Sequence, residues 1–119
     1  MARSDNEATV KAFWTAMGKR DIEGYLAVFA EGAVAYDPVN KPPARTQAER
    51  RAFMQGVFDG FARIDASIDF MTHCGDHTAT KWTVLGVTPG GDKVTIEGVD
   101  VVRHDDSGKI VELWGYFDN

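Results

Sequence analysis

The chain has 119 residues, enough for one domain with its own core and too few for two ordinary ones, so we expect a single domain over residues 1–119. Hydrophobic residues make up 44% of the chain, which is typical of a globular protein and excludes a disordered one. Eighteen acidic residues against thirteen basic ones give a net charge of −5, which argues against nucleic acids and anionic membrane surfaces as partners.

The first part of the chain predicts two helices. In residues 4–19 the apolar positions recur at helical spacing and predict a helix with one buried stripe. A second helix is expected over residues 21–30, with Asp21 as its N-cap and Gly32 at its C-terminal end. The stripe of the first helix consists of Val10, Phe13, Trp14 and Met17.

A short strand is predicted at residues 33–37, followed by a proline-rich loop in which neither a helix nor a strand continues easily. Thr46 and Glu49 fit a capping box and predict the start of a third helix, which should end near Gly60. Its apolar side comprises Phe53, Met54, Val57, Phe58 and Phe61.

The second half of the chain predicts strands, because apolar and polar residues alternate from Arg63 to Phe70. Three more strands are expected over residues 78–88, 93–103 and 109–117, joined by turns rich in Gly and Asp. Helices first and hairpin-linked strands later indicate an α+β fold. We expect a cone-shaped domain in which a curved antiparallel sheet wraps around three N-terminal helices and encloses an apolar cavity.

The single cysteine, Cys74, cannot form an internal disulfide, and no signal peptide or membrane helix is apparent, so we expect a cytoplasmic protein.

The cluster His73, Cys74, Asp76 and His77 has metal-binding residue types. Its spacing crosses a turn rather than a helix and no second cluster exists, so we predict a hydrogen-bonded turn and no metal.

Asp100 interrupts an apolar strand face. In residues 93–103 the even positions are otherwise Val, Ile and Gly, and side chains at alternate positions share one face. The pattern therefore carries a carboxyl group into the interior, where a raised pKa is expected. Two alternatives stay open: Asp100 pairs with the backbone or with Arg103, or a bulge turns it to solvent.

Asp37 stands at the end of the first short strand and directly before Pro38. Asp followed by Pro is an ordinary way to open a turn, and that interpretation needs no catalytic role. The alternative is a base at the rim of the cavity.

Three segments together resemble the ketosteroid isomerase and SnoaL-like group of the nuclear transport factor 2-like superfamily. They are DIEGYLAVF (residues 21–29), FAEGAVAYDPVNKPPARTQAERRAF (residues 29–53) and GVDVVRHDDSGKIVELWGYF (residues 98–117). The resemblance implies the cone-shaped fold and a cofactor-independent enzyme in which Asp37 is the base and Asp100 a protonated hydrogen-bond donor. Members of this group have a tyrosine that binds the oxyanion and a second, supporting tyrosine. The resemblance places Phe13 and Met54 at these two positions, and neither side chain donates a hydrogen bond.

The resulting hypothesis is proton transfer next to a carbonyl of a hydrophobic small molecule, as in an isomerase or cyclase. One alternative is a non-catalytic binding or dimerisation module that has lost the chemistry, and another is water activation by the two carboxyl groups in a hydrolase or dehydratase.

Apolar residues on both faces of the last strand predict a homodimer through the outer face of the sheet. The expected ligand-binding side chains, all of which also suit a core, are Phe13, Trp14, Tyr36, Met54, Trp82, Val102, Trp114 and Tyr116.

Overall fold

The structure, a computed structural model, describes residues 3–119 and contains three helices and five strands. In chain order they are α1 (Arg3–Gly18), α2 (Ile22–Ala27), β1 (Phe29–Tyr36), α3 (Gln47–Gly60), β2 (Arg63–Cys74), β3 (His77–Val87), β4 (Lys93–His104) and β5 (Ile110–Phe117). The predicted α+β class is therefore confirmed.

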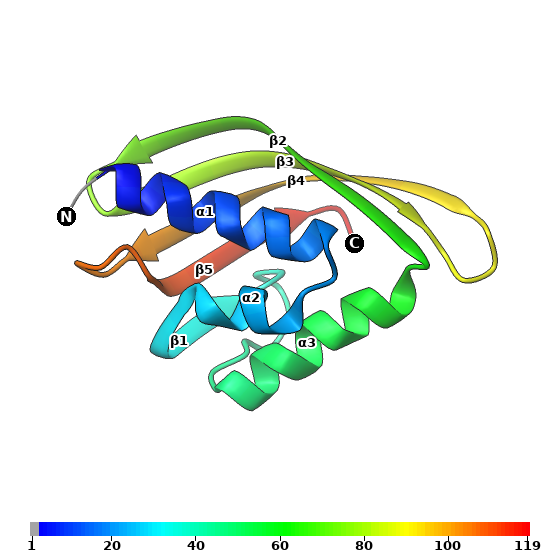
Figure 1. Cartoon of the computed structure of the whole chain (residues 1–119), viewed down its shortest axis with the longest axis horizontal. Coiled ribbons are helices and arrows are strands. Elements are labelled where there is room, and N and C mark those ends of the chain that lie inside the picture. The colour runs from blue at the N-terminus through cyan, green and yellow to red at the C-terminus, as the bar shows by residue number, and fades with distance from the viewer. Residues whose placement is uncertain (1–2) are drawn as a thin grey trace.

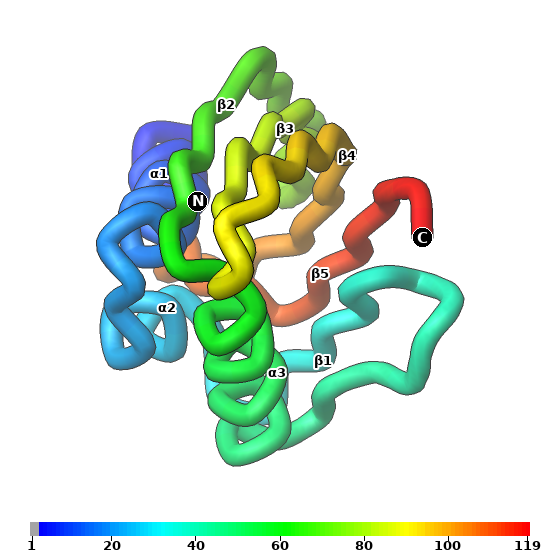
Figure 2. The backbone as a smooth tube through the Cα atoms, turned by 90° about the vertical axis from the view of Figure 1, so that its right-hand side faces the viewer, coloured from blue at the N-terminus to red at the C-terminus, as the bar shows by residue number. Residues whose placement is uncertain are grey.

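The five strands form one sheet in the order β1-β5-β4-β3-β2. The three hairpin-linked pairs are antiparallel, as predicted, whereas β1 lies parallel to β5 at the edge. The sheet curls from β2 to β1, and the helices lie on its concave side (Figures 1 and 2). This arrangement leaves the inner face of the sheet and the helices to enclose the apolar interior.

The N-terminal caps of α2 and α3 lie where the sequence predicts them. The Asp21 carboxylate accepts a hydrogen bond from the Gly24 amide at 3.0 Å, and the Thr46 hydroxyl accepts one from the Glu49 amide at 3.1 Å. Each cap satisfies an amide that the first turn of a helix leaves without a partner.

The predicted end of the second helix is wrong. The helix ends at Ala27 rather than at residue 30, because the chain there pairs with β5: the Ile110 amide donates to the Val28 carbonyl at 2.9 Å. Gly32 has a positive φ of 76°, but it lies inside β1, where the pairing with β5 shifts register. Backbone pairing with a distant strand therefore overrides the local helical pattern.

The predicted stripe of α1 is buried, with Val10, Phe13, Trp14 and Met17 all in the core. Phe70, in contrast, does not continue the inner face of β2. The pairing of β2 with β3 shifts register between Ile68 and Phe70, and 63% of the Phe70 side chain is exposed. A β-bulge turns the following side chain to the other face, which alternation alone does not reveal.

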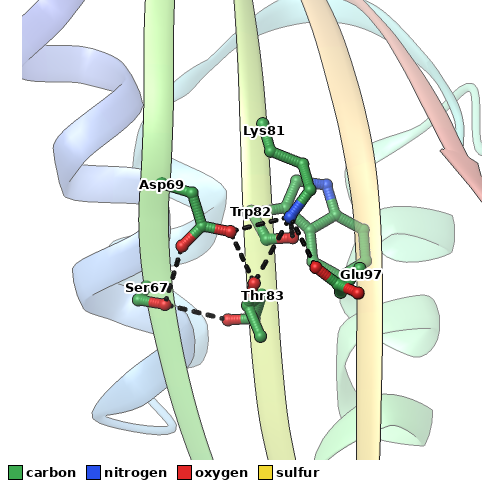
Figure 3. A network of polar contacts seen from close by, with 6 residues as sticks. All are labelled: Ser67, Asp69, Lys81, Trp82, Thr83 and Glu97. Carbon is green, nitrogen blue, oxygen red and sulfur yellow. Dashed lines mark hydrogen bonds and ion pairs between the residues drawn. The ribbon is translucent and has the colours of Figure 1, made fainter.

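The outer face of the sheet carries a polar network centred on Lys81 (Figure 3). The Lys81 ammonium donates to Asp69 at 2.7 Å and to Glu97 at 3.0 Å, so it bridges carboxylates from β2 and β4. The Thr83 hydroxyl also donates to Asp69. These contacts leave the opposite faces of the same strands free for apolar packing against the helices.

The turn between β2 and β3 contains the His and Asp cluster predicted to be a hydrogen-bonded turn. His77 contacts the Asp76 carboxylate at 2.8 Å, and His73 shares a 2.9 Å hydrogen bond with Thr78. Over residues 3–119, no three His, Cys, Asp or Glu side chains gather as metal ligands. None of the described helices is long and apolar enough to cross a membrane.

Candidate active site

A cavity of about 250 Å³ lies between the helices and the inner face of the sheet. Its walls are aromatic and aliphatic side chains of α1, α3 and the strands, among them Phe13, Trp14 and Trp82. Two carboxyl groups, Asp37 and Asp100, also line it. An apolar cavity with a few convergent polar groups is the usual setting of a small-molecule site.

Asp100 lies on the inner face of β4, as its alternation predicts, and is only 5% exposed. Neither alternative reading is seen: no register shift interrupts the pairing of β4 with β3 at this position, and Arg103 pairs instead with Glu112 at 2.9 Å. The indole N–H of Trp82 donates to Asp100 Oδ1 at 3.1 Å. A neutral carboxyl group with its proton on Oδ2 is compatible with this bond, because Oδ1 then remains the acceptor.

Asp37 directly follows β1 and is half-buried. The loop behind it is fixed to β5, because the Val39 amide donates to the Gly115 carbonyl at 3.0 Å. Ala35 and Ala44 exchange two backbone hydrogen bonds of 2.9 Å, which close the base of the proline-rich loop. Asp37 is thus held by backbone contacts on both sides and is not an exposed turn residue.

The two carboxyl groups meet over Gly115. A Cβ atom placed on Gly115 would lie 3.2 Å from Asp100 Oδ1 and closer still to Asp37 Oδ1. Gly115 is also the β5 residue that pairs with Asp100 of β4. Only a residue without a side chain leaves room here for both carboxyl groups.

Burial shifts the titration of both groups in the same direction. Loss of water raises the pKa of Asp37 to about 6. Burial also raises the pKa of Asp100 well above its usual range, and the charge of Asp37 raises it further, against the smaller opposing effect of the Trp82 hydrogen bond. Of the pair, the more deeply buried Asp100 therefore holds a proton more readily, and Asp37 is the stronger acid.

The sequence from residue 10 to residue 113 matches the SnoaL-like domain family, which is most of the chain. The chain belongs to the SnoaL-like domain family. No curated protein matches the sequence at a significant level.

Solved structures share the fold at low sequence identity. SalBIII, an epoxide hydrolase/cyclase-like enzyme with a role in pyran ring formation in the polyether salinomycin, is 18% identical with a TM-score of 0.87, over 97% of this chain and 92% of that chain. RV0760c from Mycobacterium tuberculosis, in complex with estradiol-17beta-hemisuccinate, is 20% identical with a TM-score of 0.84, over 96% and 94%. An NTF2-like protein from Burkholderia pseudomallei is 23% identical with a TM-score of 0.85, over 99% and 92%.

In this SnoaL-like domain, three of the predicted ligand-binding residues line the cavity: Phe13, Trp14 and Trp82. The rings of Trp14 and Trp82 pack with their centroids 5.3 Å apart. Gly98 leaves space for the Trp82 ring, because a Cβ at Gly98 would overlap it. The position of Trp82, and with it the hydrogen bond to Asp100, thus depends on a second glycine.

The other five predicted ligand-binding residues do not line this cavity. Met54 is fully buried in the core, and Val102 borders a small adjoining gap with Phe13 and Asp100. Tyr36 and Trp114 stack on each other with ring centroids 6.4 Å apart, away from the cavity. Tyr116 is 47% exposed.

Sequence reasoning missed Gly115 and several apolar residues of the wall. Phe53, Val57 and Phe61 line the cavity from α3 and the segment after it. The helical spacing of apolar residues in the sequence already indicates that these three side chains face the interior, and so could have predicted them as part of the wall. Gly115 offered none, because a glycine in a strand does not reveal what packs on it.

Gly115→Ala is expected to lower the free energy of unfolding by about 1–3 kcal/mol, because the new methyl group overlaps a buried carboxyl group. Urea denaturation measures this loss. Gly56→Ala is the matched control, since nothing lies within 4 Å of a Cβ at Gly56, and no loss is expected there. Wild-type stability in Gly115→Ala would contradict the meeting of the two carboxyl groups over this residue.

Proposed function

We propose that this SnoaL-like domain catalyses proton transfer next to a carbonyl group of an apolar small molecule. The observation that carries the proposal is the pair of carboxyl groups that meets at one cavity, where burial raises the pKa of Asp37 to about 6 and that of Asp100 well above its usual range. Asp37, ionised at neutral pH, removes the proton from carbon. Asp100, neutral and within the cavity wall, donates a hydrogen bond to the developing enolate oxygen.

The apolar wall supports the same chemistry. Aromatic and aliphatic side chains around Asp37 exclude water from a carbanion-like intermediate and strengthen the hydrogen bond from Asp100. In an isomerisation, Asp37 takes the proton from the carbon beside the carbonyl and returns it to the γ carbon, so that the double bond moves into conjugation. No cofactor is needed for this step.

A non-catalytic binding module is the second candidate. The loss of two tyrosines favours this module. The ketosteroid isomerase group has tyrosines where this chain has Phe13 and Met54, and neither of these side chains donates a hydrogen bond. RV0760c is a structural neighbour with a bound steroid ester, which supports a hydrophobic small molecule as the partner in either case. The retained carboxyl pair distinguishes the two candidates, since binding alone does not require Asp37 to be ionised.

The proposal includes a homodimer through the outer face of the sheet. Large apolar side chains are exposed there on four adjacent strands: Phe70, Leu85, Val99 and Tyr116. Phe70 and Val99 pair with Lys81 from the two neighbouring strands, so the expected interface has apolar contacts beside a polar centre.

The conversion of 3-cyclohexen-1-one to 2-cyclohexen-1-one tests the proposed reaction, because this one-ring ketone suits the cavity and its product absorbs in the ultraviolet. We expect kcat/KM to rise with pH through about 6, as Asp37 ionises, and to fall at high pH as Asp100 loses its proton. Asp100→Asn should remove the fall at high pH, since the amide remains a donor. A rate equal to that of buffer at every pH would contradict the proposed catalysis and favour the non-catalytic binding module.

A further inference from the structure

Asp37 and Phe53 each line two cavities, the inner one described above and a second one on the side of the proline-rich loop. The outer pocket has a volume of about 320 Å³. Its other walls come from the end of β1, the loop and the first turn of α3: Ala35, Pro42, Pro43, Ala44 and Glu49. The carboxyl group of Asp37 and the ring of Phe53 therefore stand at the junction between the two spaces.

We propose that the inner cavity and the outer pocket are two parts of one ligand site, with Phe53 as the partition that sets the length of the ligand. The inner cavity alone, at about 250 Å³, lies below the range of roughly 300–1,000 Å³ common for small-molecule sites. The two volumes of about 250 and 320 Å³ together lie well inside that range. This inference rests on the proposed function, because it concerns the same cavity and the same base.

The outer pocket is built from fixed elements. The paired backbone hydrogen bonds between Ala35 and Ala44 hold one side, and the capped start of α3 holds the other. The Glu49 carboxylate accepts the Arg45 amide at 2.8 Å, which fixes this side chain at the rim. A ligand that passes Phe53 therefore meets the fixed wall of a pocket whose rim, at Pro42 and Glu49, is exposed to solvent.

The charges of the outer pocket define the chemistry of the part that occupies it. Its described lining contains two carboxyl groups, Asp37 and Glu49, and no lysine or arginine. Arg50, on the same helix, points away, since its guanidinium donates to the Ala33 carbonyl and lies over the Phe29 ring. We therefore expect an apolar ring system in the inner cavity and an uncharged, hydroxylated chain in the outer pocket. A phosphate or carboxylate there would be repelled.

Calorimetric titration with three naphthols tests this arrangement. 2-Naphthol fills the inner cavity alone, 6-(4-hydroxybutyl)-2-naphthol adds a neutral chain, and 6-(3-carboxypropyl)-2-naphthol adds an anionic one. For the wild-type protein we expect the hydroxybutyl probe to bind about tenfold more tightly than 2-naphthol, through the apolar area that its chain buries. The carboxypropyl probe should show no such gain.

Two substitutions block the outer pocket from different sides. Phe53→Trp enlarges the partition and Pro42→Trp fills the pocket from its exposed rim, so each should abolish the tenfold gain. Because Pro42 lines only the outer pocket, Pro42→Trp should also leave 2-naphthol binding within about twofold. Val57→Phe is the matched control, because Val57 lines only the inner cavity, and it should weaken both probes alike. If Phe53→Trp disturbs the fold, Pro42→Trp alone decides.

The outcomes separate the inference from the proposed function. Binding of 2-naphthol with no gain from the chain, or with a gain that survives Pro42→Trp, overturns the two-part site and leaves the proposed function intact. No binding of 2-naphthol to the wild-type protein overturns the ligand site itself, and both proposals with it. A gain that is also seen with the carboxypropyl probe overturns the expected chemistry of the outer pocket.

Discussion

Asp37→Asn is expected to lower the rate of 3-cyclohexen-1-one isomerisation by a factor of about 10²–10⁴, because the amide cannot accept the proton from carbon. Ligand affinity should stay within a few-fold of wild type, since the substitution preserves the shape of the cavity wall. The loss should therefore appear in kcat rather than in KM. Steady-state kinetics together with calorimetric titration of 2-naphthol measure the two quantities separately.

The same substitution should stabilise the folded protein at neutral pH. The pKa of Asp37 is about 6 in the folded state and 3.8 without the fold, so its contribution to stability is complete below pH 4 and is lost as the pH rises through 6. Asn cannot ionise and avoids this loss. We expect the free energy of unfolding of Asp37→Asn to exceed that of the wild type by about 1–3 kcal/mol at pH 8, and to equal it near pH 4.

An inactive but equally stable Asp37→Asn protein at pH 8 would show that Asp37 is not a buried carboxyl group with a raised pKa. An unchanged rate would contradict its role as the base and favour the non-catalytic binding module. Together, the two measurements separate the chemistry of Asp37 from its place in the fold.

Phe13→Tyr is expected to raise the isomerisation rate by a factor of about 10²–10³, which is the usual contribution of one hydrogen-bond donor to an oxyanion. Phe13 lines the cavity together with Asp100, so a hydroxyl group on this ring adds a donor on the same wall. The gain should appear in kcat, because the developing charge exists only in the transition state.

Met54→Tyr is the matched control for this gain. Met54 takes the position of the second tyrosine in the resemblance, but it is fully buried and does not line the cavity. A new hydroxyl group there has no access to the ligand and carries an overpacking cost of about 1–3 kcal/mol. If Phe13→Tyr binds 2-naphthol and is no faster than wild type, the proposed mechanism does not apply to this protein.

Local periodicity was sufficient for most of the elements and for one of the two carboxyl groups. The alternation around Asp100 correctly placed its side chain on the inner face of β4, because a strand without a bulge directs every second residue to the same side. Where a long-range contact disturbed the local pattern, the prediction was wrong. The second helix was predicted too long because β5 pairs with the chain at Val28, and Phe70 was misplaced because a bulge follows Ile68.

The amino-acid sequence by itself determined the α+β class, the caps at Asp21 and Thr46, and the inward direction of Asp100, since each depends on neighbours within a few residues. Only the tertiary structure brought Asp37 to Asp100. Their meeting over Gly115 depends on the register of β4 with β5 and on the loop hydrogen bond from Val39. These contacts join segments far apart in the chain, and Gly115 contributes only the absence of a side chain. For both reasons no local motif predicts the cavity or its partition at Phe53.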